Sequence, residues 1–293
     1  MSEFRNNEKL SNHTNYKIGG EASHFILLNP ESNLKEVSTF IKENKLPYFI
    51  LGLGSNCLVP DEKIDAIILK FDRRDTLIDW DADFIYTSAG TPISSLLIEA
   101  KKQGWDGFEK LAGIPANVGG AVFMNAGTHL GDVSDLISKV EVYNLKDETF
   151  QEIEVERDDF AYRENLFLKD HDLITGVYWK LVKATPLEVA RKQKEILVRR
   201  KATQPLQSPS CGSVFKNPKE MPAWKVIDEL GLRGKQIGGA QISEMHSNWI
   251  LNTGGATQGD VLSLMDSIEL QANQTLGINL EREVRLLELK NLN

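Results

Sequence analysis

The sequence predicts an α+β protein with more than one domain, and three observations support this. Segments typical of strands and of helices alternate through the first 185 residues. The pair Thr185-Pro186 then interrupts the alternation and precedes a long basic helix. A length of 293 residues allows two or three domains. We therefore place a domain boundary between residues 185 and 186.

The first 185 residues carry clear start and stop signals. Pro30 is suited to open a helix, because the residues after it repeat apolar side chains at helical spacing. A second helix is predicted to begin at Thr91-Pro92 and to end at Gly104. Apolar runs between turn residues predict strands. These strands are expected at residues 48–51, 66–71, 84–87, 139–143 and 173–179, the first of them buried.

Two helices and a strand are predicted in the C-terminal region. The basic helix runs from Leu187 to about Lys201. A later helix begins at Thr257, where Asp260 completes a capping box, and it ends at Gly277. Residues 279–289 are then expected to form a strand.

Composition argues against several classes of protein. A net charge of −8 disfavours non-specific binding to nucleic acid or to an anionic membrane. No run of about 18 apolar residues is present to span a bilayer, and the first residues lack the apolar segment of a secretory signal. The cytoplasm is therefore the expected location. Cys57 and Cys211 are too few for a zinc site or a disulfide framework, and the five histidines lack ligand spacing, so we predict no metal.

Two glycine-rich loops are candidates for binding a phosphate-bearing cofactor. The first, GLGSNC at residues 52–57, follows a strand, but Cys57 stands where a G-x-G-x-x-G fingerprint has its third glycine. A Rossmann fold is therefore disfavoured, although exposed backbone N–H groups there are suited to cradle a phosphate. The second loop, residues 113–127, also has the composition of a tight connection between packed elements. Two such loops together favour a large, extended cofactor.

A third loop, residues 209–218, has the composition of a catalytic loop. Ser213 carries a transferable proton, and Lys216 adds a positive charge three positions later. The preceding glycine permits close approach of backbone to a ligand. Taken alone, such a polar loop is more often a turn, so the rest of the chain has to support a catalytic role.

Seven strings make the chain resemble the UDP-N-acetylenolpyruvoylglucosamine reductases, the flavoenzymes of peptidoglycan precursor synthesis. They occur in family order and cover nearly the whole chain, and the short length resembles the compact second class of that family. The strings are YKIGG (16–20), LGLGSN (51–56), GIPANVGGAVFMNAG (113–127), FAYR (160–163), CGSVFKNP (211–218), GLRGKQIGGAQISEMHSNWILN (231–252) and LEREVR (280–285).

The resemblance implies a fold and a reaction. Residues 1–185 would form an FAD-binding region of the vanillyl-alcohol-oxidase (PCMH) type, with two α/β subdomains that meet near residues 72–80. Residues 186–293 would form an α+β domain that binds a UDP-sugar. FAD would be bound noncovalently, and NADPH would reduce it. The reaction would convert UDP-N-acetylglucosamine enolpyruvate to UDP-N-acetylmuramate for cell-wall biogenesis, on which cell shape and cell division depend. We favour a monomer as the oligomeric state.

The resemblance also assigns site residues. Ser213 matches the family's proton donor, Arg163 the arginine of its YR string and Glu283 the glutamate of its EVR string. The first glycine loop would hold the pyrophosphate and the second would line more of the flavin site. The matching positions are Gly52, Gly54, Ser55 and Asn56 in the first loop and Gly119, Gly120, Ala121, Asn125, Ala126 and Gly127 in the second.

These residue types suit the implied chemistry. Hydride addition to the conjugated double bond places charge on the substrate carboxylate, where the planar fork of Arg163 is suited to stabilise it. Ser213 would then protonate the carbon next to the carboxylate, and Glu283 would order this network or donate a proton if it is itself protonated. Cys211 is the rival donor, because a thiol is the stronger acid, but we rank it as a neighbour.

The same residues have simpler interpretations without the resemblance. Arg163 would form a surface salt bridge with Asp159 or Glu164. Glu283 would be an exposed carboxylate on a strand with alternating charges. The resemblance is what favours the catalytic interpretation of each.

A basic patch near the active loop is the candidate for the phosphates of UDP or NADPH. Its members Arg199, Arg200 and Lys216 are predicted to bind substrate, although cations at a helix end also complement the helix dipole. Four positions depart from the family pattern, and none removes a proposed catalytic group. These positions are Ala116, Asn117, His129 and Asn165.

Two other functions stay open. One is a different flavin oxidoreductase or oxidase on the same fold, which would have no need to protonate an enolate. The other is a non-catalytic nucleotide-binding protein that kept the scaffold.

Overall fold

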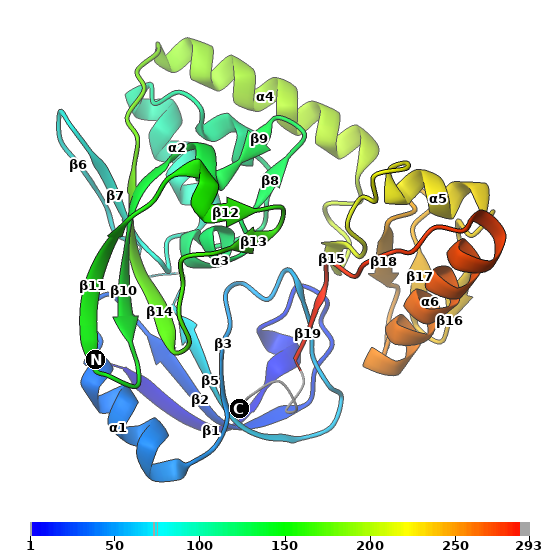
Figure 1. Cartoon of the computed structure of the whole chain (residues 1–293), viewed down its shortest axis with the longest axis horizontal. Coiled ribbons are helices and arrows are strands. Elements are labelled where there is room, and N and C mark those ends of the chain that lie inside the picture. Colours follow the sequence, from blue (N-terminus) through cyan, green and yellow to red (C-terminus); the bar gives the residue numbers. More distant parts are fainter. Residues whose placement is uncertain (1, 73, 75, 288–293) are drawn as a thin grey trace. The chain divides into compact units, whose positions relative to one another are not determined.

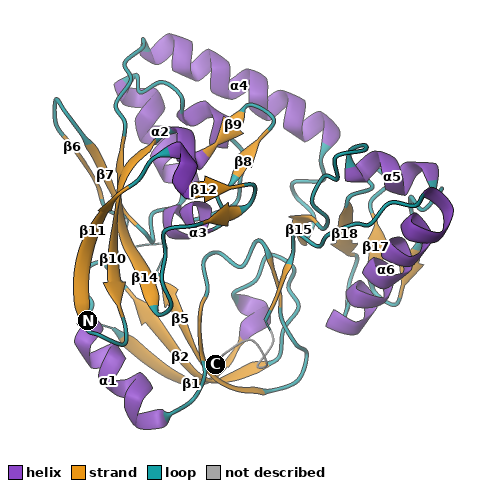
Figure 2. Cartoon of the chain, in the orientation of Figure 1, coloured by secondary structure: helices purple, strands orange, loops and turns teal. Residues whose placement is uncertain are grey.

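The computed structural model describes residues 2–72, 74 and 76–287, and they form two compact units (Figure 1). Unit 1 comprises residues 2–5, 24–53 and 67–199. Unit 2 comprises residues 6–23, 54–66 and 200–287. Each unit therefore combines segments that are distant in the sequence. Helices and strands both contribute throughout, and the α+β prediction is confirmed (Figure 2).

Unit 1 contains a five-stranded antiparallel sheet. Most apolar side chains of its central strands are buried, whether they alternate with polar residues or follow one another. The fully buried Trp179 donates its Nε1–H to Thr87 Oγ1 at 2.8 Å. Across the sheet, the strands are β11 (Thr149–Glu154), β10 (Ile137–Asn144), β14 (Asp172–Trp179), β7 (Ile85–Ser88) and β6 (Ile78–Trp80).

A second sheet contains the N-terminal strands of the chain. Its order is β1 (Glu3–Lys9), β2 (Glu21–Leu28), β5 (Ile64–Phe71) and β3 (Tyr48–Ile50), and β3 pairs with β5 in parallel. Leu34 and Val37 of α1 (Leu34–Asn44) belong to the same buried core of unit 1 as Ile26 and Leu28 of β2.

The remaining elements of unit 1 are short, apart from two helices. In α2 (Ile93–Gln103), Gly104 caps the C-terminus with φ of +74°, and a β-carbon there would lie 2.4 Å from Ala184 O. Helix α4 (Pro186–Thr203) begins in unit 1 and ends in unit 2. The others are η2 (Phe108–Leu111), α3 (Val118–Phe123), β8 (Gly127–Thr128), β9 (Gly131–Asp132), η3 (Val133–Asp135), η4 (Arg157–Asp159), β12 (Phe160–Ala161) and β13 (Glu164–Asn165).

Unit 2 contains a small antiparallel sheet covered by α6 (Gln258–Gln271). Val261, Leu264 and Met265 of α6 share one core with Tyr16, whose hydroxyl donates to Ile250 O at 2.8 Å. The sheet order is β15 (Ser210–Ser213), β18 (Trp249–Asn252), β17 (Ala240–Ile242) and β16 (Gln236–Ile237). The other elements are η1 (Leu10–Asn12), β4 (Cys57–Leu58), α5 (Ala223–Glu229), the π-helical η5 (Ala272–Leu276) and β19 (Arg285–Leu286), which pairs with β4 in parallel.

The helix-end predictions are mostly confirmed. Thr257 caps α6 and shares a reciprocal capping box with Asp260, and Gly277 follows η5 with φ of +69°. The helix placed after Pro30 starts later, at Leu34, because Asn33 is its N-cap and accepts a hydrogen bond from Glu36 N.

Two strand predictions need correction. Residues 279–284 do not form a regular strand, and only Arg285–Leu286 does; residues 288 and 289 lie outside the described part. The strand at 48–51 is present but not buried, since Ile50 of β3 is 46% exposed. Short apolar runs do not reveal by themselves which side chains the fold covers.

Within the described part of the chain, no helix combines the length and the apolar character needed to cross a membrane.

Candidate active site

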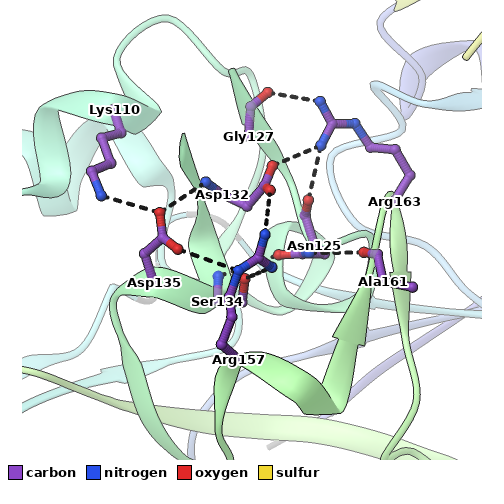
Figure 3. Close-up of polar contacts among 9 residues, drawn as sticks. All are labelled: Lys110, Asn125, Gly127, Asp132, Ser134, Asp135, Arg157, Ala161 and Arg163. Carbon is purple, nitrogen blue, oxygen red and sulfur yellow. Dashed lines mark hydrogen bonds and ion pairs between the residues drawn. The ribbon is translucent and has the colours of Figure 1, made fainter. Parts of the chain in front are cut away.

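A tight hairpin presents Arg163 in unit 1 (Figure 3). Strands β12 and β13 pair so that Tyr162 and Arg163 are the two turn residues. Arg163 has φ of +60°, the left-handed region, where a residue with a β-carbon is strained by about 1 kcal/mol or more. Its guanidinium carbon lies 4.8 Å from the centroid of the Tyr162 ring. Strain that surrounding contacts maintain is common at functional sites.

The Arg163 guanidinium is held by three acceptors from one stretch of chain. Nη1 donates to Asn125 O at 3.1 Å and to Asp132 Oδ1 at 3.0 Å, and Nη2 donates to Gly127 O at 3.0 Å. The side chain is only 13% exposed, and that of Asp132 is 17% exposed. Sequence alone suggests a surface salt bridge with Asp159 or Glu164, and the described residues show an ion pair with Asp132.

Asn125 connects the segment after α3 to the Arg163 hairpin (Figure 3). It is fully buried; its Nδ2 donates to Ala161 O at 2.9 Å and its Oδ1 accepts from Ser134 N at 3.2 Å. The Asn125 carbonyl is one of the Arg163 acceptors. Its side chain therefore fixes the loop that holds the guanidinium.

A network of charged side chains surrounds this ion pair. Arg157 Nη2 donates to Asp132 Oδ2 at 3.3 Å, and Lys110 Nζ donates to Asp135 Oδ2 at 3.1 Å. Within the described residues, ion pairs join three cations, those of Arg163, Arg157 and Lys110, to the carboxylates of Asp132 and Asp135. Sequence reasoning missed Lys110, Asp132, Asp135 and Arg157, because no motif or spacing singles them out.

Gly52 of the first loop and Gly119 and Gly120 of the second face protein atoms. A β-carbon added at Gly52 or at Gly120 would lie 2.8 Å or 2.7 Å from Asn117 Oδ1, and one at Gly119 would lie 3.0 Å from Ala89 Cβ. Asn117 is the N-cap of α3 and accepts from Gly120 N at 3.1 Å. Packing within unit 1 is thus enough to require small residues at these positions, without a flat ring beside them.

The backbone amides of the second loop are also used within the protein. Gly119 N donates to Ala89 O at 2.9 Å, Ala121 N to Asn117 O at 2.9 Å and Ala126 N to Ala121 O at 2.8 Å. These amides are therefore engaged inside unit 1, and this loop fits a packing role better than a phosphate cradle.

The part of the first loop that belongs to unit 2, from Gly54 to Cys57, has a different environment from the second loop. Gly54 has φ of +66°, and its carbonyl accepts from Asn15 N at 2.9 Å. The N–H groups of Gly54, Ser55 and Asn56 donate to no group within the described residues. Three consecutive amides available as donors suit an anion such as a pyrophosphate. This donor set therefore fits the phosphate-binding role expected of the loop.

Ser213 lies at a bulge in the sheet of unit 2. It pairs with Trp249, and the register shifts between Ser210 and Ser213. Gly212, inside the bulge, has φ of +75°. Bulges of this kind re-aim the neighbouring side chains. Ser213 is consequently half-buried.

Cys211 is directed into the core of unit 2. It is 3% exposed, and its Sγ donates to Cys57 O at 3.0 Å. Burial raises the pKa of the Cys211 thiol well above its usual range. The structure therefore disfavours Cys211 as the rival donor and leaves Ser213 as the accessible member of the loop.

Glu283 lies beside the same loop. Its N–H donates to Val214 O at 2.9 Å, and its carbonyl accepts from Asn56 Nδ2 at 3.1 Å. The residue is half-buried and lies in an irregular segment, so it is not the exposed strand carboxylate of the simpler interpretation. Unit 2 thus brings together Ser213, Glu283 and Asn56, whereas Arg163 belongs to unit 1.

The predicted basic patch has protein partners. Lys216 forms an ion pair with Glu281, and Arg199 Nη1 lies 3.1 Å from His129 Nε2. Arg200 Nε donates to Gln204 Oε1 at 2.9 Å, and burial lowers the pKa of Arg200, although arginine stays charged at any physiological pH.

Three of the four departures from the family pattern make side-chain contacts in the structure. Asn117 caps α3, as a serine or threonine would. Asn165 Nδ2 donates to Phe123 O at 2.8 Å and so attaches the Arg163 hairpin to the end of α3. His129 contacts Arg199.

Comparison with known proteins identifies two domain families and close full-length relatives. Residues 22–154 match the FAD binding domain family, and residues 204–287 match the C-terminal domain of UDP-N-acetylenolpyruvoylglucosamine reductase. The UDP-N-acetylenolpyruvoylglucosamine reductase of Halalkalibacterium halodurans is 37% identical and that of Thermotoga maritima 38% identical. These alignments cover 98% and 95% of this chain and 95% and 97% of the relatives. The crystal structure of the enzyme from Thermus caldophilus superposes with a TM-score of 0.82 at 34% identity, over 98% of this chain and 99% of that one.

Proposed function

The chain belongs to the UDP-N-acetylenolpyruvoylglucosamine reductase family, and we propose that Arg163, Ser213 and Glu283 are its catalytic residues. The protein is an FAD-dependent oxidoreductase that uses NADPH. It reduces UDP-N-acetylglucosamine enolpyruvate to UDP-N-acetylmuramate in peptidoglycan precursor synthesis. Full-length similarity to enzymes of this name is the observation on which the assignment of activity depends.

The residues available in the first glycine loop fit a bound FAD. The amides of Gly54, Ser55 and Asn56 would hold its pyrophosphate, because their donors are not consumed by the described residues. When bound, FAD supplies the hydride chemistry that no side chain supplies. We retain Gly52, Gly119, Gly120 and Ala121 as cofactor-binding residues, and the three glycines would also let α3 pack closely. We retain Asn125, Ala126 and Gly127 as cofactor-binding residues, with the added role of holding Arg163.

Arg163 would stabilise the charge that develops on the substrate carboxylate. The guanidinium is nearly buried and fixed by hydrogen bonds, so it would need little rearrangement as the charge forms. A preorganised donor of this type is typically worth about 3 kcal/mol in the transition state. Lysine at this position would lack the planar pair of donors.

Ser213 would donate the proton that completes the reduction. Its hydroxyl proton passes to the carbon next to the substrate carboxylate, and the serine oxygen recovers a proton from Glu283 or water. The bulge at Gly212 gives Ser213 its half-buried position, while Cys211 stays in the core. Glu283 lies on the segment hydrogen-bonded to Val214, where it is suited to order this proton transfer.

We assign the cofactor to residues 1–185 and the UDP-sugar to residues 186–293. Arg199, Arg200 and Lys216 would meet phosphates of the substrate or of NADPH, and Lys216 would exchange its Glu281 partner for the ligand. The substrate and both cofactors are molecules of the cytoplasm, where we expect the protein to act as a monomer. No partner other than these small molecules is proposed.

An absorbance experiment tests this function. The purified protein should be yellow, bleach when NADPH is added without oxygen, and regain colour when UDP-N-acetylglucosamine enolpyruvate follows. A colourless protein that no added FAD converts would indicate a nucleotide-binding protein instead. Recovery with oxygen but not with the enolpyruvyl substrate would indicate an oxidase.

A further inference from the structure

We propose that Asp132 is a positioning residue that holds Arg163 in place for the substrate carboxylate; this inference rests on the function proposed above. Asp132 ends β9, and its Oδ1 accepts from Arg163 Nη1 at 3.0 Å. The two side chains are 17% and 13% exposed. Because water screens this pair less than an exposed one, removal of the carboxylate charge has a larger effect on the arginine.

Among these three acceptors of Arg163, Asp132 is the charged one. The carbonyls of Asn125 and Gly127 bind the same guanidinium but are neutral. Gly127 is also the residue opposite Asp132 in the β8–β9 hairpin. Two of the three acceptors, Gly127 and Asp132, therefore lie in one small hairpin. Asp132 links the position of this hairpin to that of the Arg163 guanidinium (Figure 3).

Arg157 fixes Asp132 from the other side. Its Nη2 donates to Asp132 Oδ2 at 3.3 Å, and its Nη1 donates to Ser134 Oγ at 2.7 Å. Each oxygen of Asp132 thus faces a different guanidinium, which restricts rotation of the carboxylate. Arg157 shares the Asp132 carboxylate with Arg163, so Asp132 orients Arg163 without giving it the whole of its negative charge.

The reaction makes this orientation matter. Negative charge on the substrate carboxylate grows as the hydride arrives, and an arginine stabilises it only if its donors already point at the correct place. A displacement of about 1 Å in such a group can cost about 100-fold in rate. Arg163 has a long side chain on a strained turn, so a charged anchor is needed to keep its end in one place.

Substitution Asp132→Asn removes the charge and keeps the size and a hydrogen-bond acceptor. Flavin reoxidation by the enolpyruvyl substrate should slow about tenfold, while reduction by NADPH should stay within about twofold of the unsubstituted rate. In titration calorimetry, binding of UDP-N-acetylmuramate, which has the carboxylate, should weaken about tenfold. Binding of UDP-N-acetylglucosamine, which lacks it, should not change. Asp106→Asn is the matched control, because Asp106 forms an ion pair with Lys192 in unit 1 at 2.6 Å and its side chain is 27% exposed, and it should leave all four measurements near their original values.

A double-mutant cycle with Arg163→Lys shows whether Asp132 acts through the arginine. In the Arg163→Lys background, Asp132→Asn should change reoxidation less than about twofold. Equal losses in both backgrounds, equal weakening of both ligands, or unchanged product binding would each overturn the proposal.

If Asp132→Asn does not fold, Arg157→Met tests the same anchor, because Arg157 is largely exposed and its loss frees Asp132 from one side. An unsubstituted protein that the enolpyruvyl substrate fails to reoxidise would refute the proposed function and this inference with it, whereas an active protein with a normal Asp132→Asn variant would refute the inference alone.

Discussion

The backbone N–H of Glu283 donates to the carbonyl oxygen of Val214 at 2.9 Å, which places the glutamate beside the residue that follows Ser213. The two segments are far apart in the chain, and each lies in the core-forming part of unit 2, where Val214 and Val284 are buried. Together with the hydrogen bond from Lys216 N to Glu281 O at 2.8 Å, this contact joins the segment of the candidate proton donor to that of its candidate assistant.

This arrangement predicts that Ser213→Ala affects only one half-reaction. NADPH should still bleach the flavin at the normal rate, because no proton is delivered to substrate in that step. Reoxidation by the enolpyruvyl substrate should slow by about 10²- to 10⁴-fold, the usual contribution of a positioned proton donor. Stopped-flow absorbance measures both rates.

Cys211→Ala is the control for Ser213→Ala. It removes a buried thiol two residues away, so it should lower the free energy of unfolding while leaving reoxidation within about threefold of normal. If Cys211→Ala slows reoxidation as strongly as Ser213→Ala does, the serine is not the specific donor.

The first glycine loop predicts a strong effect of Gly54→Ala. The added β-carbon would lie 2.4 Å from His13 O at a residue with φ of +66°, so backbone has to shift. We expect the free energy of unfolding to fall by about 3 kcal/mol or more, and the affinity for FAD to fall with it. Urea denaturation and FAD titration of the apoprotein measure the two effects.

Gly277→Ala separates the clash from the backbone strain. Gly277 has a similar φ of +69°, but a β-carbon there meets no atom within 4 Å. It should cost only about 1 kcal/mol and leave FAD affinity unchanged. Equal losses for the two variants would mean that the clash at Gly54 is relieved without moving the loop.

Local features of this fold were predictable from sequence, and the contacts between distant segments were not. The capping box of Thr257 and Asp260 depends on residues three apart, so the pattern alone reveals it. Asp132 and Arg163 are 31 residues apart, and nothing in the spacing around Asp132 marks it as the partner. The resemblance pointed to Arg163 and could not show what holds it.

The glycine-rich loops illustrate the same limit. Both were predicted as close approaches to a ligand, because glycine marks any place where something lies near the backbone. The sequence does not say whether that neighbour is a ligand or the protein. At Gly52 and Gly120 the neighbour is Asn117, while at Gly54 to Asn56 the amides stay available.

His246 predicts a pH dependence of stability. Desolvation, followed by the charge of Arg233, lowers the pKa of His246 below its ordinary value of 6.5, and its Nδ1 is buried without a hydrogen-bond partner in the described residues. The unfolded chain then binds a proton more readily than the folded one. The free energy of unfolding should therefore decrease as pH falls from about 6.5 toward the lower folded pKa, and change little above pH 7.

Denaturation at a series of pH values checks this sign. In His246→Gln, the slope of unfolding free energy between about pH 5.5 and 6.5 should be shallower than in the unsubstituted protein. A slope that stays the same in the variant would assign the effect to other groups, and a stability that rises on acidification would contradict the direction.

The ion pair between Lys216 and Glu281 predicts opposite effects for its two members. If Lys216 meets a substrate phosphate, Lys216→Ala should raise KM for the UDP-sugar about tenfold and leave kcat nearly unchanged, because the contact is made equally in ground and transition states. Glu281→Gln releases the lysine from its competitor and should leave KM the same or lower it. The KM of the unsubstituted enzyme should also rise with salt more steeply than that of Lys216→Ala, since screening weakens a charge contact that the variant no longer has. A higher KM in both variants would show instead that the pair shapes the loop and that Lys216 does not touch the ligand.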